Sequence, residues 1–398
     1  SRAAPMAAAD ALLAALFAPF PRVRLVADAG DGLSSGADGP GDGRGRRVVA
    51  ATAAEPGNEL LSGAAYLSAT LPSWRKRVCA FCWELAPRRL TVSCADCSAA
   101  FYCSPVCRAA HDAGATPPSL ASPPAGVSVA APLPHAALCS VLKAFSSFKG
   151  DAELESVLIM LAESLARQRL EEEGKEAAAG PKPRPLVHAH FSALESHAGA
   201  MSDRDRRDFH KGASFLAAAL TRAGWPRVPP VAALVDAASA VCSNNFGCWR
   251  QPGRAAPAVA AVEEGEGADA RADASPRDLD AAPGGALVGR ELYISISMFN
   301  HSCSPNVRVT HAAGAAAVVA DAPISPGDEL CVAYVDVDAP RCARRAELRR
   351  SFFFECACPR CGAEEKEGSG KMRYAASVQG GGGGAPKRRG RKARVSRG

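Results

Sequence analysis

The sequence contains few aromatic residues and no long apolar run. Aromatic residues make up 6% of its 398 residues. No apolar run approaches the roughly 18 residues that a membrane-spanning helix requires, so a membrane protein is not expected. Residues 7–20 are apolar, but Asp10 interrupts them and no basic region precedes them, which makes them a poor signal peptide. The length exceeds that of one ordinary domain, so two or three units are expected.

The main part of the chain also lacks an excess of charge of either sign. The formal net charge is +6, but residues 385–398 hold seven basic residues and no acidic one, so the rest of the chain carries −1. A basic nucleic-acid groove in the folded part is therefore not expected. The tail is typical of a nuclear-localisation or polyanion-binding segment, and a solvated disordered tail is an equally good interpretation. Its basic residues are Lys387, Arg388, Arg389, Arg391, Lys392, Arg394 and Arg397.

Cysteine, in contrast, is abundant, with fifteen residues. Many of these cysteines form closely spaced pairs in a long chain without a secretory signal, which favours zinc in a reducing compartment over disulfides. The region 79–139 supplies eight soft ligands, enough for two tetrahedral zinc sites. His111 competes with His135 for one position, since it follows Cys107 by four residues. The eight ligands form the pairs Cys79 and Cys82, Cys94 and Cys97, Cys103 and Cys107, and His135 and Cys139.

Seven polar and small residues, Asn300–Asn306, follow an apolar run that alternates like a half-buried strand, Leu292–Phe299. Such residues cannot form a packed core, so we expect a loop that directs hydrogen bonds toward a bound molecule. Further strands are expected near Val307–Thr310 and Ala316–Ala320. A Pro-Gly-Asp turn then precedes an apolar strand that ends at Tyr334.

The rest of the chain divides into a β-rich start, a helical middle and two linker-like stretches. Short strands are expected at Val23–Ala27 and Val48–Ala51, and apolar residues at helical spacing predict helices across residues 141–240. We expect a mobile loop between Asp112 and Pro134 and a disordered insertion at Gln251–Gly285. Four histidines of the helical region are expected to be satisfied or exposed rather than metal ligands: His188, His190, His197 and His210.

Three of these motifs together resemble one known family. Asn300–Asn306 looks like the NHSCxPN signature of SET domains, and the paired cysteines with Phe101-Tyr102 resemble a MYND zinc finger. Cys356-x-Cys358-x-x-Cys361 resembles the post-SET motif. A MYND finger inserted in a split SET domain is similar to the SMYD-type protein-lysine methyltransferases, and the resemblance covers about residues 22–362.

The resemblance implies an α+β fold. In this fold a β-rich SET domain is split by a zinc-binding MYND finger and a helical insert, and a zinc-bound post-SET segment follows. The expected parts are the N-terminal part of SET (22–75), the MYND finger (76–140), the helical insert (141–240), the core SET (241–337), the post-SET segment (338–364) and a disordered basic tail (365–398).

The resemblance also implies S-adenosylmethionine as cofactor and three zinc ions. Ligand pairs interleave in the family, so Cys79, Cys82, Cys103 and Cys107 are expected to hold one zinc, and Cys94, Cys97, His135 and Cys139 a second. Cys303 is expected to join Cys356, Cys358 and Cys361 around the third. The implied cofactor-binding residues are Gly43, Arg44 and Gly45 of a Gly-rich loop, Asn244 of an Asn-x-Phe element, Asn300, His301, Tyr334 and Phe354.

Tyr334 is the expected catalytic residue, with its hydroxyl near the methyl group and the incoming nitrogen. Two positions depart from the family pattern. Arg46 replaces a commoner hydrophobic residue, and Phe352 stands where close relatives often have a second tyrosine.

The expected function is S-adenosylmethionine-dependent methyl transfer to lysine side chains of histone or non-histone proteins. The alternative is a non-catalytic MYND/SET adaptor that binds proline-rich partners in transcriptional regulation. The expected partners are a protein substrate and a proline-rich peptide at the finger. No membrane contact is expected, and nucleic acid only through the basic tail. We expect a monomer located in the nucleus, the cytoplasm or both.

Overall fold

The computed structural model describes residues 3–27, 45–121, 123, 126–174, 186–250, 286–312 and 314–366. The chain divides into two compact units, residues 1–356 and 357–398, and each is described by itself. In the second unit residues 359–366 are helical. The predicted disordered insertion at Gln251–Gly285 and residues 367–398 of the predicted basic tail lie outside the described residues, whereas residues 365 and 366, the first two of that tail, belong to the helical segment.

The first unit contains short antiparallel sheets. β1 (Val23–Val26) pairs with β2 (Arg47–Ala50), within one residue of the strands predicted there. Two larger, three-stranded sheets have the strand orders β10-β11-β3 and β4-β8-β7. Their strands are β3 (Glu59–Ala64), β10 (Val307–Ala312), β11 (Ala315–Ala320), β4 (Leu67–Thr70), β8 (Ala286–Leu292) and β7 (Asn245–Arg250).

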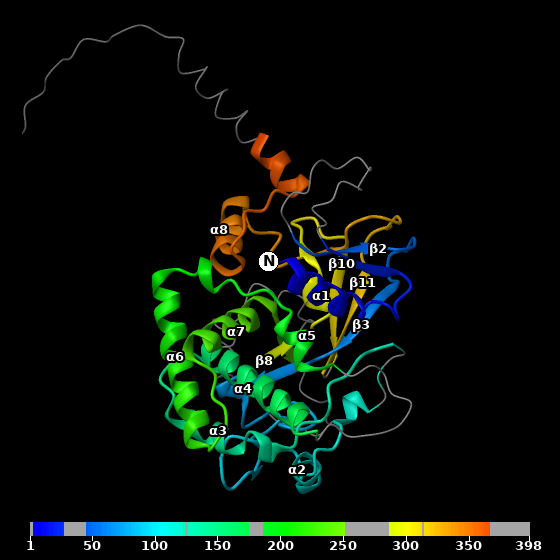
Figure 1. Ribbon diagram of the computed structural model, residues 1–398. Helices are drawn as coiled ribbons and strands as arrows, with labels where there is room; N and C mark the ends of the chain where they lie inside the picture. Colours follow the sequence, from blue (N-terminus) through cyan, green and yellow to red (C-terminus); the bar gives the residue numbers. More distant parts are fainter. Residues whose placement is uncertain are drawn as a thin grey trace, which may run out of the picture. The chain divides into compact units, whose positions relative to one another are not determined.

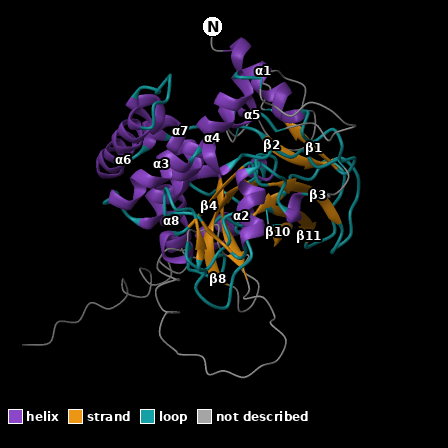
Figure 2. Ribbon diagram, turned by 90° about the horizontal axis from the view of Figure 1, so that it is seen from below, coloured by secondary structure: helices purple, strands orange, loops and turns teal. Residues whose placement is uncertain are grey.

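Helices occupy most of residues 139–244 and gather on one side of the sheet of β3, β10 and β11 (Figures 1 and 2). The α+β prediction is confirmed, and the sheets of the described residues do not close into a barrel. The helices of this region are α3 (Cys139–Ala144), α4 (Ala152–Glu172), α5 (His188–Ser192), α6 (Asp203–Arg222) and α7 (Val231–Asn244).

Helix α4 is the central helix of this group, and its residues from Leu154 to Ala166 are all buried. It begins at Asp151, whose side chain accepts a hydrogen bond from the Leu154 N–H at 2.7 Å. The helix also buries two carboxylates. Glu155 pairs with Arg75 at 2.5 Å, and Glu163 accepts from the Ser68 N–H at 2.9 Å. These bonds fix α4 to β4 and to the chain that follows it.

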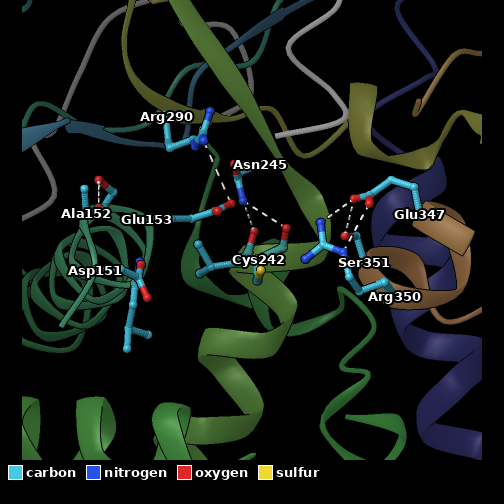
Figure 3. A network of polar contacts seen from close by, with 12 residues as sticks. Asp151, Ala152, Glu153, Cys242, Asn245, Arg290, Glu347, Arg350 and Ser351 are labelled. Atoms are coloured by element: carbon cyan, nitrogen blue, oxygen red, sulfur yellow. Dashed lines mark hydrogen bonds and ion pairs between the residues drawn. The ribbon is translucent and has the colours of Figure 1, made fainter. Parts of the chain in front are cut away.

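Polar contacts lie close together at the start of α4, the end of α7 and β8 (Figure 3). Arg290 on β8 is fully buried and its Nη2 lies 3.9 Å from Glu153 Oε1. Asn245 donates from Nδ2 to the carbonyl oxygens of Val241 and Cys242, at 3.0 and 2.9 Å. The Asn245 amide thus closes the last turn of α7 where the chain enters β7.

The N-terminal apolar stretch forms helix α1 (Ala3–Ala14) and a following turn, and it packs in the first unit. Leu13, Leu16 and Phe17 are at most 5% exposed. Among the helices of the described residues, none combines the length and apolar character needed to cross a membrane.

The strand predicted at Leu292–Phe299 is wrong. β8 ends at Leu292, and Ile296–Met298 form a 3-10 helix, η8. The Tyr293 carbonyl accepts bonds from both the Ser297 N–H (2.9 Å) and the Ser297 hydroxyl (2.8 Å), which closes a helical turn. Ser297 is only 7% exposed and faces protein as the apolar residues do, so the alternation of serines with apolar residues does not mark a solvent-exposed face.

Candidate metal centres and active site

The first cluster of ligands lies in the finger, which is the name used here for residues 76–140. Short strands β5 (Val92–Ser93) and β6 (Phe101–Tyr102) pair, and Cys103 follows β6 directly. Helix α2 (Pro105–Asp112) begins after Ser104, whose hydroxyl accepts from the Cys107 N–H at 3.2 Å. This cap fixes the first turn of α2, which carries Cys107, next to Cys103, which lies just before the helix.

The sulfur atoms of Cys79, Cys82, Cys103 and Cys107 all lie within 4.8 Å of one another. Cys82 and Cys103 are 3.7 Å apart, and Cys103 and Cys107 are 3.3 Å apart. Zinc–sulfur bonds of about 2.3 Å in a tetrahedron separate the sulfurs by about 3.8 Å. The spacing therefore fits one zinc ion.

The second cluster contains Cys94, Cys97, His135 and Cys139, whose ligand atoms also lie within 4.8 Å. Cys94 and Cys139 sulfurs are 3.6 Å apart, and Cys97 Sγ is 3.6 Å from His135 Nε2. His135 is 5% exposed. The competing ligand, His111, instead has its Nδ1 3.2 Å from the Tyr102 hydroxyl. The geometry thus groups the ligands in the interleaved order that the resemblance implies.

The electrostatics of the first cluster favour a bound cation. The neighbouring Cys82 sulfur lowers the pKa of Cys79 to about 5, and the Cys79 sulfur in turn raises the pKa of Cys82. Burial raises the pKa of Cys103 to about 11. One anionic sulfur thus opposes further ionisation of its neighbours, and a divalent cation at the centre would remove that repulsion.

The stretch between Asp112 and Pro134, expected to be mobile, is anchored where it is described. Leu186 N–H donates to the Val129 carbonyl at 3.0 Å, and Arg167 Nη1 donates to the Ala131 carbonyl at 2.5 Å. Its described residues include a 3-10 turn at Pro118–Leu120 and an isolated parallel bridge between Ala130 and Leu186. Its mobility stays a prediction.

The loop Asn300–Asn306 is held by its two amide side chains. β9 (Asn300–His301) pairs in parallel with β12 (Cys331–Val332). Asn306 donates to the Glu329 carbonyl and accepts from the Cys331 N–H, both at 2.9 Å. Asn300 Nδ2 donates to the Arg46 carbonyl at 3.0 Å and to Glu329 Oε1 at 2.9 Å. The loop is therefore tied to two segments distant in sequence.

Four aromatic side chains meet next to this loop. The Tyr334 ring centroid lies 5.4 Å from that of His301, 4.8 Å from that of Phe352 and 6.4 Å from that of Phe354. Tyr334 is 8% exposed, and its hydroxyl donates to the Phe299 carbonyl at 2.7 Å. Because that bond takes the phenolic proton, the hydroxyl oxygen acts as an acceptor toward other groups.

The tautomer of His301 follows from its contacts. Its Nδ1 accepts from the Tyr334 N–H at 2.9 Å, so in the neutral ring the proton is on Nε2. Nε2 lies 3.3 Å from Cys303 Sγ and donates to it. One imidazole thus connects the backbone of Tyr334 with the sulfur of Cys303.

The cysteines of the third predicted zinc site fall in both units. Cys303 and Cys356 belong to the first, where their sulfurs are 3.9 Å apart, close to the separation expected around one zinc. Cys358 and Cys361 belong to the second unit, at the start of its helical segment. The complete set of four stays a prediction.

The remaining predicted cofactor residues have different outcomes. Gly43 and Arg44 lie outside the described residues. Gly45 has φ +73°, a conformation that glycine adopts readily. Asn244 ends α7 and its Nδ2 donates to the Ala240 carbonyl at 2.8 Å, so the described bond of its amide serves the helix. Its role at a cofactor stays a prediction.

Arg46, the departure from the family pattern, has a structural explanation. Its Nε donates to Asp10 at 2.7 Å and its Nη1 to the Ala193 carbonyl at 3.0 Å. The guanidinium thus joins α1 to the segment after α5, which a hydrophobic residue could not do.

Two buried charged residues, Glu291 and Arg344, were not among the predicted site residues. Glu291 on β8 is fully buried, pairs with Arg250 at 2.8 Å and accepts from the Tyr293 hydroxyl at 2.6 Å. Arg344 is 2% exposed and contacts Cys303. Charged residues in a single sequence suggest a solvated surface, so no sequence signal marked these.

Comparison with known proteins agrees with this arrangement. Residues 159–335 match the family model of the SET domain. The matched range includes the loop Asn300–Asn306 and Tyr334, and the predicted resemblance to SET-containing methyltransferases is confirmed.

The similar curated proteins are named N-lysine methyltransferases. SMYD2 of Rattus norvegicus is 39% identical over 80 residues, which are 20% of this chain and 18% of that protein. SMYD2 of Homo sapiens is 38% identical with the same shares. SMYD2-B of Danio rerio is 40% identical over 74 residues, 19% of this chain and 17% of that protein. The aligned part of the chain therefore spans less than a fifth of the length of these relatives.

The finger geometry predicts two zinc ions that are needed for its fold. Cys97→Ser should lower the zinc content of the purified chain by one ion, which elemental mass spectrometry measures. The same variant should increase proteolysis within the finger. Cys342→Ser is the control, since Cys342 is exposed and outside the clusters. An unchanged zinc content in Cys97→Ser would contradict a metal site there.

Proposed function

We propose that this chain transfers methyl groups from S-adenosylmethionine to lysine side chains of proteins. The observation that carries the proposal is the meeting of Tyr334, His301 and Phe354 beside the loop Asn300–Asn306 within a SET domain. The names of the similar proteins support it. Because those proteins are matched over less than a fifth of their length, the activity of the whole chain is a proposal.

The side chains and backbone at the loop fit the proposed cofactor, which supplies a methyl group on a positively charged sulfur. Both N–H groups of the Asn300 amide bond to protein, which leaves Oδ1 as an acceptor for the cofactor's amino group. Gly45, with the neighbouring Gly43 and Arg44, would bring backbone close to its methionine part. The His301 backbone and the half-buried ring of Phe354 would hold the adenine.

The attacking lysine must lose its proton, since only a neutral amine has a lone pair for the methyl carbon. The rings of Tyr334, Phe352 and Phe354 exclude water around the position proposed for the amine, and low polarity favours its neutral form. The Tyr334 oxygen, fixed by its bond to Phe299, would accept a hydrogen bond from the amine and align it.

Zinc would act structurally in this mechanism. Two ions would hold the finger through its eight ligands. The third, bound by Cys303, Cys356, Cys358 and Cys361, would tie the post-SET segment to the loop Asn300–Asn306. We propose histone or other protein substrates and a location in the nucleus, the cytoplasm or both.

Replacing the catalytic tyrosine tests the function directly. Tyr334→Phe should lower kcat by about 100-fold or more, because a positioned acceptor is lost from the transition state. Mass spectrometry of methylated lysines in a panel of histone and non-histone proteins measures this, and calorimetry measures any accompanying change in cofactor binding separately. Activity within about threefold of wild type would exclude the proposed role of Tyr334.

We expect the side chain at position 352 to influence how many methyl groups are added to the lysine. Its ring lies 4.8 Å from that of Tyr334 and brings no hydroxyl. Phe352→Tyr should fill space and add a hydrogen-bonding group, shifting the product ratio toward monomethyl-lysine by about tenfold, as intact-mass analysis can measure. An identical product distribution in both proteins would place Phe352 outside the lysine site.

A cavity at the finger favours a second function, the binding of a proline-rich partner in transcriptional regulation. The cavity has a volume of about 800 Å³, and its walls include Phe81, Trp83 and Phe101. Aromatic walls of this kind suit extended proline-rich peptides. Cofactor binding without transfer to any lysine, together with peptide binding that Trp83→Ala abolishes, would favour this adaptor function over catalysis.

A further inference from the structure

We propose that Arg344 is a positioning residue for the metal centre at Cys303, which it serves by donating a hydrogen bond to the ligand sulfur. The inference rests on the third zinc site of the proposed function. It assigns a role there to Arg344, which is not one of the four proposed cysteine ligands. Helix α8 (Arg341–Phe352) carries Arg344.

The contact is between a buried cation and a buried sulfur. Arg344 is 2% exposed and Cys303 is fully buried. Arg344 Nε lies 3.3 Å from Cys303 Sγ, and its Nη1 donates to the Ala339 carbonyl at 2.6 Å. The second bond fixes the plane of the guanidinium, so Nε–H is aimed at the sulfur. A buried guanidinium is costly unless an anion or strong acceptor compensates it, and a metal-bound thiolate is such a partner.

A second N–H group, on the nearby residue His301, contacts the same sulfur. His301 Nε2–H lies 3.3 Å from Cys303 Sγ, and its tautomer is fixed by the Tyr334 N–H. Cys303 therefore accepts from two N–H groups. Donors to a coordinating atom orient it and balance its charge, and their loss typically weakens metal binding by about 10–100-fold.

The next residue on α8, Arg345, contacts the segment that carries Cys356. Arg345 Nε donates to the Cys356 carbonyl at 3.2 Å. Two consecutive arginines of α8 thus contact Cys303 and Cys356, whose sulfurs are 3.9 Å apart. The helix arranges half of the proposed ligand set, so less order has to be gained when the metal binds.

Arg344→Met tests the inference, because methionine keeps an apolar stem but has neither the charge nor the N–H donors. In the full-length chain we expect one zinc ion of three to be released about 10–100-fold faster to a chromogenic chelator, while the two finger ions leave at wild-type rates. Arg344→Lys, which keeps the charge without the planar donor, should be intermediate and carries the test if Arg344→Met does not fold.

Arg350→Met is the matched control on the same helix. Arg350 pairs with Glu347 at 2.6 Å (Figure 3), and its side chain is 69% exposed. It should release zinc as the wild type does. A loss of packing alone would lower the melting temperature without selecting one zinc ion, so selective release separates positioning from a purely structural role.

Two results would overturn the inference. If Arg344→Met and Arg344→Lys release all three ions at wild-type rates, Arg344 does not act on the centre, and the proposed methyl transfer is untouched. If wild type and Cys303→Ser each hold only two ions, the third centre itself is rejected and the role of Arg344 with it.

Discussion

The candidate site depends on the hydrogen bonds that hold the loop Asn300–Asn306 against Glu329–Cys331. Asn306 satisfies a carbonyl and an N–H of that segment, and Asn300 reaches both Glu329 and the Arg46 carbonyl, 254 residues earlier. Little of this loop is regular structure, so side-chain amides replace the ladder bonds that a strand would provide. The fixed loop then determines where His301 and Cys303 lie, and through them the Tyr334 backbone and α8.

Much of the site could be predicted because its chemistry requires local patterns. A Cys-x-x-Cys pair and a Cys-x-x-x-Cys pair each place two zinc ligands close together whatever the rest of the fold is. In the structure His135 lies in the second cluster of possible ligands, whereas His111 contacts Tyr102. The strands at β1, β2, β10 and β11 were also predicted closely, because their apolar residues alternate or run together between turn signals.

What the sequence could not predict depends on tertiary contacts. The run after β8 alternates apolar and small residues, yet it turns at η8 because Ser297 bonds the Tyr293 carbonyl and both faces are covered. The charges of Glu291 and Arg344 are buried because partners from other segments compensate them. Arg46 breaks the family pattern because Asp10 lies next to it in space. No local pattern encodes such pairings.

The central claim is that the amides of this loop build a binding site for S-adenosylmethionine. Calorimetric titration of the cofactor into wild type and Asn306→Asp tests it most directly, because aspartate cannot donate to the Glu329 carbonyl. The wild-type chain should bind, and Asn306→Asp should bind at least about tenfold more weakly, a change of about 1.4 kcal/mol. Equal affinities, or no binding by the wild type, would contradict the claim.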